Sequence, residues 1–228
     1  MLSRRKLLGC GAAVAAIPLF PIPAVAASKA TRTFDLFRAD RRIGSKSLTV
    51  ERSGSIVAVS IEIDIKVRIL GIPAYSYALR SNERWDRGRL MRLEAATNDN
   101  GTSERVSATR RDGGVAVEGT GYTGLVKGNP GTTTYWSRAF LERPVWISTQ
   151  SGLPMRISAQ RAGMDTIFTA DGARIDATRW QIRGNIGELD LFYDAAGEWV
   201  GSNFEAKGEK AGFRLRNRGG SLSSLWIG

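Results

Sequence analysis

The stretch at residues 55–70, SIVAVSIEIDIKVRIL, decides the fold class of this 228-residue chain. Its apolar residues recur at every second position and alternate with small or charged residues. The apolar set is Val57, Val59, Ile61, Ile63, Ile65, Val67 and Ile69. A period of two predicts a half-buried strand, whereas a helix would scatter the same residues around its circumference. At about 3.3 Å per residue the strand is long, so we expect it to bend within a curled sheet.

Further strand-like runs lie on both sides of this stretch and are separated by turn residues. They cover residues 34–37, 45–51, 74–85, 89–97, 102–110 and 115–118, and resume at residue 145. The Asn-Asp-Asn-Gly sequence at residues 98–101 predicts a hairpin turn, because Asn and Gly tolerate positive φ. Many short strands without an amphipathic helical run predict an all-β fold. We expect a single curled antiparallel sheet that forms a barrel, a half-barrel or a β-spiral, because closure limits exposed edges.

Three other segments interrupt or end the strand pattern. Residues 119–133 are rich in Gly and are interpreted as a flexible loop, and residues 134–141 are expected to form one short helical turn. Residues 217–228 lack a strand pattern, which predicts a loose C-terminal tail. The length of the chain fits one β-rich domain, which we place at residues 28–216.

The first 27 residues predict an export signal. Arg4 and Arg5 lie in a Ser-Arg-Arg-x-Leu-Leu motif that resembles the twin-arginine signature, a receptor-read address. An apolar run follows, and then Ala24 and Ala26 at the spacing that signal peptidase accepts. We therefore expect an N-terminal signal helix, transport by the twin-arginine translocase, cleavage next to Ala26 and a periplasmic mature protein.

Removal of this signal changes the composition of the chain. Cys10 lies in a Leu-Leu-Gly-Cys sequence that looks like a lipoprotein box, but the box would lie inside the apolar run, too early for cleavage there. Cleavage next to Ala26 removes Cys10, the only cysteine, and three basic residues, so the net charge falls from +11 to +8. The excess positive charge fits either simple solubility or an anionic partner such as a phospholipid headgroup.

The absence of histidine narrows the chemistry of the chain. Ser-His-Asp centres and imidazole zinc sites are excluded, and a mature chain without cysteine excludes thiolate metal sites. We therefore expect no metal and no cofactor. The Gly-x-Gly-x-x-Gly string that begins at Gly119 matches the dinucleotide fingerprint, but no helix of useful length follows it. We interpret it as part of the Gly-rich loop.

Carboxylates offer the remaining route to catalysis. Glu62 and Asp64 point to the same side of one strand, about 7 Å apart by strand geometry, and Asp35 and Glu83 are further candidates. Paired acids at such a spacing would suit a glycosidase acting on a periplasmic glycan or polymer. Basic residues continue the face of Glu62 and Asp64, however, so an exposed charge ladder is the simpler interpretation.

Aromatic residues supply the candidate ligand site. Tyr75 and Tyr77 share a strand face, Trp85 ends the same strand, and Tyr135 and Trp136 follow the Gly-rich segment. Large rings of this kind either fill the core of a barrel or line a cavity for an apolar or amphipathic ligand. We expect no nucleic-acid partner, because the chain carries no nucleic-acid motif and is predicted to be exported.

Six short blocks of the strand-rich region form an ordered set. They are SNERW at 81–85, GRL at 88–90, NDNG at 98–101, TTYW at 133–136, STQSG at 148–152, and LFYD at 191–194 with the residues through Gly208. This set resembles the domain-of-unknown-function family numbered 6134 over roughly residues 33–216. The resemblance implies an exported bacterial β-rich protein, distantly similar to spiral-β envelope-integrity proteins and to lipoprotein-carrier half-barrels. It transfers no catalytic residue.

These observations favour a non-enzymatic periplasmic protein of the cell envelope. Such a protein would bind a lipid-like or other amphipathic ligand, or would support envelope integrity, with a lipid or an anionic envelope component as its partner. The alternative is a carboxylate-based enzyme that acts on a periplasmic glycan or polymer.

Overall fold

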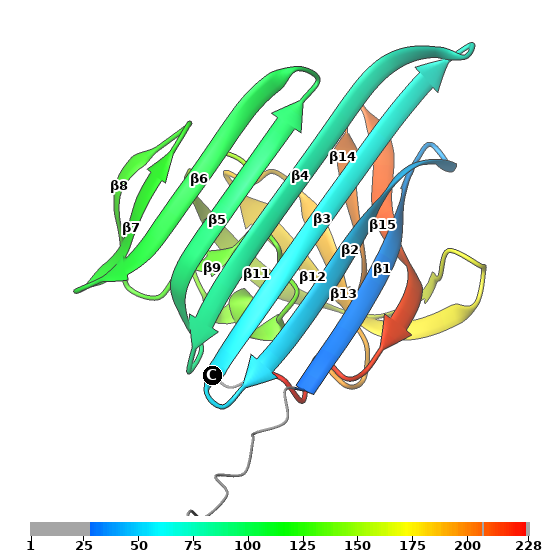
Figure 1. Ribbon diagram of the computed structural model, residues 1–228. Coiled ribbons are helices and arrows are strands. Elements are labelled where there is room, and N and C mark those ends of the chain that lie inside the picture. Colours follow the sequence, from blue (N-terminus) through cyan, green and yellow to red (C-terminus); the bar gives the residue numbers. More distant parts are fainter. Residues whose placement is uncertain (1–27, 207, 227–228) are drawn as a thin grey trace, which may run out of the picture.

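The computed structural model describes residues 28–206 and 208–226 (Figure 1). Its elements are β1 (Ser28–Arg38), β2 (Arg41–Ser53), β3 (Ile56–Ile69), β4 (Ile72–Asp86), β5 (Arg89–Asp99), β6 (Thr102–Arg111), β7 (Gly114–Gly119), β8 (Thr123–Lys127), β9 (Gly131–Thr132), the 3₁₀ helix η1 (Arg138–Glu142), β10 (Val145–Ile147), β11 (Pro154–Phe168), β12 (Arg174–Gly184), β13 (Leu189–Tyr193), β14 (Trp199–Ala206) and β15 (Glu209–Gly219). The predicted export signal, with its helix and with Arg4, Arg5, Ala24 and Ala26, lies outside the described residues.

The strands form a single sheet in the order β8-β7-β6-β5-β4-β3-β2-β1-β15-β14-β13-β12-β11-β10-β9. Neighbours are antiparallel, except that β9 runs parallel to β10. Two meanders are thus joined where the first strand pairs with the last. The sheet curls so that β11–β14 lie behind β1–β6, with β8 and β9 as its unjoined ends (Figure 1). The all-β, curled antiparallel sheet predicted from the sequence is confirmed.

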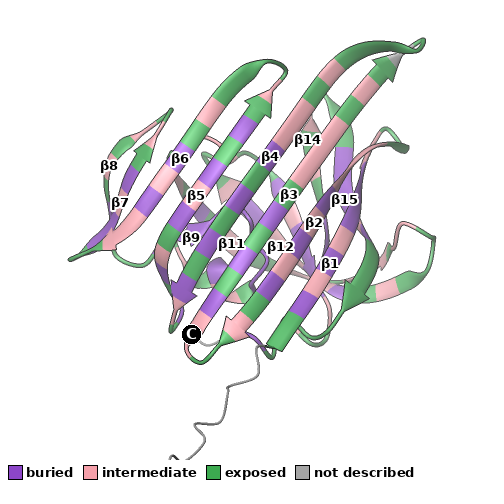
Figure 2. Cartoon of the chain, in the orientation of Figure 1, coloured by how far each residue is buried: buried purple, intermediate pink, exposed green. Residues whose placement is uncertain are grey.

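The alternating stretch at residues 55–70 forms β3. Val57, Val59 and Ile61 are buried, whereas Ser60 and Glu62 between and beyond them are exposed. Purple and green bands therefore alternate along β3 and β4 in Figure 2. Each fully buried aliphatic side chain stabilises the fold by roughly 1.5–3 kcal/mol, so the pattern fixes which face of the sheet turns inward.

The core lies on the inner face of the curl and is rich in tryptophan. The fully buried tryptophans are Trp85, Trp136, Trp146 and Trp199. A β-bulge between Phe192 and Tyr193 shifts the register of β13 against β14. Because a bulge adds one residue to one strand, it lets side chains on both sides of it point into the same face. Tyr193 and Trp199 consequently point into the core, while Phe192, which is 3% exposed, and its partner Gly201 face Ile167 at the end of the β11–β12 hairpin.

The helical turn expected near residues 134–141 is the 3₁₀ helix η1. The backbone N–H of Ala139 donates to the Ser137 hydroxyl at 3.3 Å, which caps the turn. Phe140 and Leu141 are buried, so η1 contributes to the core. Across residues 28–206 and 208–226, no helix combines the length and hydropathy that crossing a bilayer requires.

The Gly-rich segment at residues 119–133 differs from the flexible loop that the sequence predicts. It contains β8 and β9, and it is held by backbone bonds such as that from the Gly121 N–H to the Ser151 carbonyl, 2.8 Å. A Cβ at Gly119 would lie 2.5 Å from the same carbonyl oxygen. The glycines therefore permit close backbone packing, and the interpretation as a flexible loop was wrong.

The C-terminal residues also differ from the expected loose tail. The last strand continues to Gly219, beyond the predicted end of the domain at residue 216. Leu222 and Leu225 are each only 2% exposed, and Trp226 packs edge-on against Trp136, with the two ring centroids 5.2 Å apart. The signal that the sequence analysis missed is the apolar spacing of these three side chains.

Candidate functional site

Three of the predicted aromatic site residues lie in the core. Trp85 and Trp136 both donate their indole N–H groups to one oxygen of Glu83, at 2.8 and 3.4 Å. The Thr134 hydroxyl donates to the other carboxylate oxygen at 3.0 Å. Burial raises the pKa of Glu83, and the hydrogen bonds from Trp85, Thr134 and Trp136 partly oppose that shift. These residues thus form a satisfied, buried polar cluster.

A buried lysine lies next to this cluster. The Lys46 Nζ lies 4.4 Å from the centre of the Tyr135 ring and 4.5 Å from that of Trp199, with Phe213 at 5.4 Å. It donates to the Thr134 carbonyl at 3.4 Å, and the side chain is 2% exposed. Burial lowers its pKa to about 7, although the nearby Glu83 carboxylate raises it. Aromatic faces thereby replace most of the solvent around the ammonium group.

Thr134 connects the two buried ionisable side chains. Its hydroxyl bonds Glu83 and its carbonyl accepts from Lys46, so a single residue spans the carboxylate and the ammonium group. Both side chains are almost fully enclosed, at 3% and 2% exposure. Thr134 thus fixes the positions of Glu83 and Lys46 relative to each other, and both buried groups already have hydrogen-bond partners within the protein.

The remaining predicted aromatic residues lie farther along β4. Tyr77 is partly buried, and its hydroxyl donates to the Gln150 side-chain oxygen at 3.3 Å. Tyr75 donates to Asp99 at 2.7 Å. The structure therefore brings Trp85 and Trp136 together around Glu83, places Tyr135 beside Lys46, and holds Tyr75 by a bond to the neighbouring strand.

The four candidate carboxylates lie at three separate places. Glu62 and Asp64 are on the outer face of β3, and both form ion pairs with Arg80, at 3.6 and 3.0 Å. This matches the exposed charge ladder. Glu83 lies in the core cluster. Asp35 is 1% exposed and forms ion pairs with two arginines, Arg42 and Arg216, which hold its pKa below the usual value although burial alone would raise it.

An open groove of about 480 Å³ lies beneath the end of the β11–β12 hairpin. The end of the β11–β12 hairpin forms one wall, and strands β1, β13, β14 and β15 form the other. Its lining mixes aromatic and aliphatic residues, Phe37, Ile167, Phe168 and Phe192, with polar residues such as Thr166, Thr169 and Asn203. A volume of this size is typical of a small-molecule site.

The groove exists because the long β11–β12 hairpin folds back over the sheet. The backbone N–H of Ala170 donates to the Leu215 carbonyl of β15 at 2.8 Å, which ties the hairpin end to the last strand. Gly201 has no side chain, and this leaves room for the hairpin that packs over it. A Cβ at that position would lie 3.0 Å from the Phe213 carbonyl oxygen and 3.2 Å from Ile167 Cδ1.

A cation lies at the rim of this groove. Arg214 stacks its guanidinium over the Phe37 ring at 4.3 Å and forms an ion pair with the exposed Asp40 at 3.0 Å. Phe168 on the opposite wall is 51% exposed. The groove can therefore hold an apolar chain against rings while a negative group approaches Arg214, the geometry of an amphiphile site.

Sequence reasoning missed this groove because its residues come from distant segments. None of the five predicted ligand residues lines it, and Trp136 instead borders a smaller hollow of about 270 Å³ with Trp226 and Leu222. The available signal was Phe168, which ends a strand beside a turn and is exposed. The strands that complete the groove around Phe168 come together through the β-bulge in β13 and the β1–β15 pairing, and neither feature can be recognised from the sequence.

The fold and these sites define a class of protein: a curled antiparallel sheet with a closed polar–aromatic core and an open groove beneath the end of the β11–β12 hairpin. The chain belongs to the family described as "Domain of unknown function (DUF6134)", whose family profile matches residues 34–216. This confirms the family indicated by the six sequence blocks.

Solved structures of similar fold include the following one. It is the crystal structure of a beta-barrel-like protein of domain of unknown function DUF1849 from Brucella abortus, with a TM-score of 0.60 and 10% sequence identity. The alignment covers 85% of this chain and 98% of that chain. At this identity the likeness shows the fold alone. No curated protein matches the sequence significantly.

Proposed function

We propose that this chain is a non-enzymatic protein of the bacterial cell envelope that binds an anionic, lipid-like amphiphile in the groove beneath the β11–β12 hairpin. The observation that carries the proposal is the pairing of an aromatic-lined groove with a rim arginine, Arg214. The predicted twin-arginine signal supports a periplasmic location, and the net positive charge favours an anionic lipid or envelope component as ligand.

The affinity would come mainly from the apolar wall. A chain of methylene groups gains about 0.8 kcal/mol for each group removed from water, so a partly buried acyl chain can provide micromolar binding. The half-exposed Phe168 ring gains burial only when the groove is occupied. Arg214 would set the orientation of the ligand, because its guanidinium can bond a carboxylate or phosphate in two places.

The test is the displacement of a dansylated fatty acid by palmitate and by lysophosphatidylglycerol, followed by fluorescence. We expect Phe168→Asp and Arg214→Gln to weaken binding by about tenfold each. The matched controls are Leu125→Asp, an exposed leucine on the edge strand β8, and Arg80→Gln, an exposed arginine on β4. Binding that is absent from the parent protein, or that the groove variants retain at the level of the controls, would exclude the proposal.

A further inference from the structure

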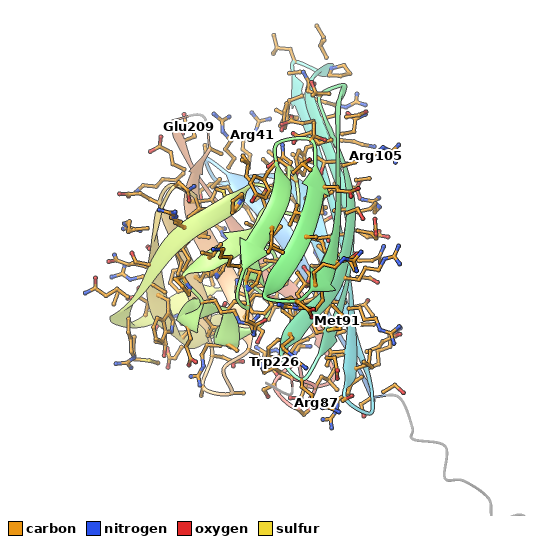
Figure 3. The ribbon with its side chains drawn as sticks, turned by 90° about the vertical axis from the view of Figure 1, so that its left-hand side faces the viewer. Arg41, Arg87, Met91, Arg105, Glu209 and Trp226 are labelled. Atoms are coloured by element: carbon orange, nitrogen blue, oxygen red, sulfur yellow. The ribbon has the colours of Figure 1, made fainter. Side chains whose placement is uncertain are left out.

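The β3–β4 hairpin projects beyond the strands on both sides of it. The pairing of β2 with β3 ends at Gly44 opposite Ile65, and the pairing of β4 with β5 ends at Tyr77 opposite Asp99. Residues 66–75 therefore extend past both neighbouring strands. Figure 3 shows this hairpin rising above the end of the molecule where Arg41, Arg105 and Glu209 lie, opposite Arg87 and Trp226.

The turn of this hairpin contains a leucine at a position whose backbone conformation disfavours leucine. Leu70 and Gly71 have φ values of 51° and 84°, the positive φ at both central positions that a type I′ turn requires. The corresponding turn between β5 and β6 uses Asn100 and Gly101, residues that suit this conformation. A branched side chain at positive φ is rare, so local turn chemistry does not account for Leu70.

The side chains at this tip are apolar and open to solvent. Leu70 is 97% exposed and Ile72 is 69% exposed, the two highest values among the large hydrophobic residues that the structure describes as exposed. Pro73 and Ala74 continue the exposed apolar surface. The other exposed large hydrophobic residues are at least four positions apart along the chain, whereas Leu70 and Ile72 lie on either side of Gly71 at the most distant point of a hairpin.

Two basic residues lie directly behind the apolar tip. Lys66 and Arg68 are exposed, and the Arg68 guanidinium donates to the Gly71 carbonyl at 3.2 Å, which holds its charge at the turn. Within residues 28–206 and 208–226, neither cation has a carboxylate within ion-pair distance. The acids nearest in sequence, Asp64 and Glu62, pair with Arg80.

We propose that this tip, Lys66–Ala74, is a membrane anchor that inserts Leu70 and Ile72 among the lipids of an anionic phospholipid bilayer. The two apolar side chains would enter the acyl boundary while Lys66 and Arg68 remain at the phosphate level, the arrangement of an interfacial anchor. The charge complementarity selects an anionic lipid surface over a neutral one. The anchor lies on different strands from the groove, so each proposal can fail without the other.

The experiment is co-sedimentation of the full chain with vesicles of phosphatidylethanolamine and phosphatidylglycerol, and with vesicles of phosphatidylcholine alone. We expect binding to the anionic vesicles, weakened about tenfold by Leu70→Asn with Ile72→Thr and several-fold by Lys66→Gln. Leu125→Thr, on β8, is the matched control and should bind like the parent chain. Every variant keeps residues 1–27, so differences between variants report on the tip.

The Leu70→Asn substitution separates anchoring from a structural role. Asn suits positive φ better than Leu, so the thermal midpoint should stay constant or rise while vesicle binding falls. The proposal is overturned if the tip variants bind anionic vesicles as tightly as Leu125→Thr does. It is also overturned if parent binding is equal on both vesicle types, or if the tip variants change only the oligomeric state in analytical ultracentrifugation.

Discussion

The Arg32 guanidinium bonds the Glu198 carboxylate inside the protein, where the two side chains are 1% and 5% exposed. Arg32 also donates to the carbonyls of Gly219 and Gly220, at 3.0 and 3.1 Å, and Glu198 accepts from the Ser221 hydroxyl at 2.8 Å. One buried ion pair thus joins the first strand, the turn before β14 and the C-terminal segment. It holds residues 219–223 against the rest of the fold.

Breaking this pair should destabilise the fold strongly. Glu198→Gln leaves Arg32 buried without its counter-charge, a change that costs about 3–5 kcal/mol. The measurement is urea unfolding followed by tryptophan fluorescence, with hydrogen exchange of residues 220–226 as a local readout. Asp194→Asn, which removes the partly exposed partner of Arg218, is the control, and an equal loss in both variants would contradict the assignment.

The same pair predicts an acid limit to stability. Burial alone would raise the pKa of Glu198, but the hydrogen bonds from Ser221 and Arg32 outweigh it and lower the pKa below the ordinary value near 4.5. The folded state therefore holds the ionised form more tightly than the unfolded state does. The stabilisation is present above pH 4.5 and disappears as the pH falls through the lowered value. Thermal midpoints of the parent and Glu198→Gln should converge in that range.

Lys46 predicts a pH dependence of the same sign, in an alkaline range. Its pKa is about 7 in the folded protein, against 10.5 for an ordinary solvated lysine, so the unfolded chain binds more protons between those pH values. Stability should therefore rise as the pH rises from 7 toward 10, by about 1 kcal/mol per unit. Lys46→Met, which keeps the length of the side chain, should abolish this slope, whereas Lys210→Met, at an exposed lysine, should preserve it.

The C-terminal segment should contribute to stability as a packed part of the core. Truncation after Ser221 removes Leu222, Leu225 and the Trp226 ring, which lies 5.5 Å from that of Trp85. Each buried leucine lost costs about 2–5 kcal/mol. We expect a marked loss in the free energy of unfolding and a red shift of tryptophan emission. Ser224→Ala, at an exposed position, should cause neither change, and a truncated chain as stable as that control would refute the packing role.

Gly119 should be intolerant of a side chain because of backbone packing. Its added Cβ would meet the Ser151 carbonyl oxygen at 2.5 Å and Gly152 Cα at 3.0 Å. We expect Gly119→Ala to cost about 1–3 kcal/mol in chemical unfolding. Gly54→Asn lies in open space at φ 61°, which Asn tolerates, so it should stay within about 0.5 kcal/mol of the parent.

Strand periodicity predicted the fold well, and long-range pairing explains what it missed. The alternation through β3 predicted the sheet correctly because every second residue along it is apolar and all of these residues point to the same face. Lys46 could have been recognised, since it occupies the same alternating phase as the buried Leu48 and Val50. The groove could not, because it depends on a bulge beside Phe192 and on the Ala170 bond to β15, which no local pattern encodes.

The pairing of β1 with β15 has a consequence for how the chain assembles. These are the first and last strands, yet they are adjacent near the middle of the strand order, so the two meanders cannot join until the end of the chain has been made. A circular permutant that starts at Gly131, links the C-terminal segment to Ser28 and ends at Pro130 would make all neighbouring strands of the sheet consecutive in sequence. Its lower contact order predicts faster refolding at similar stability.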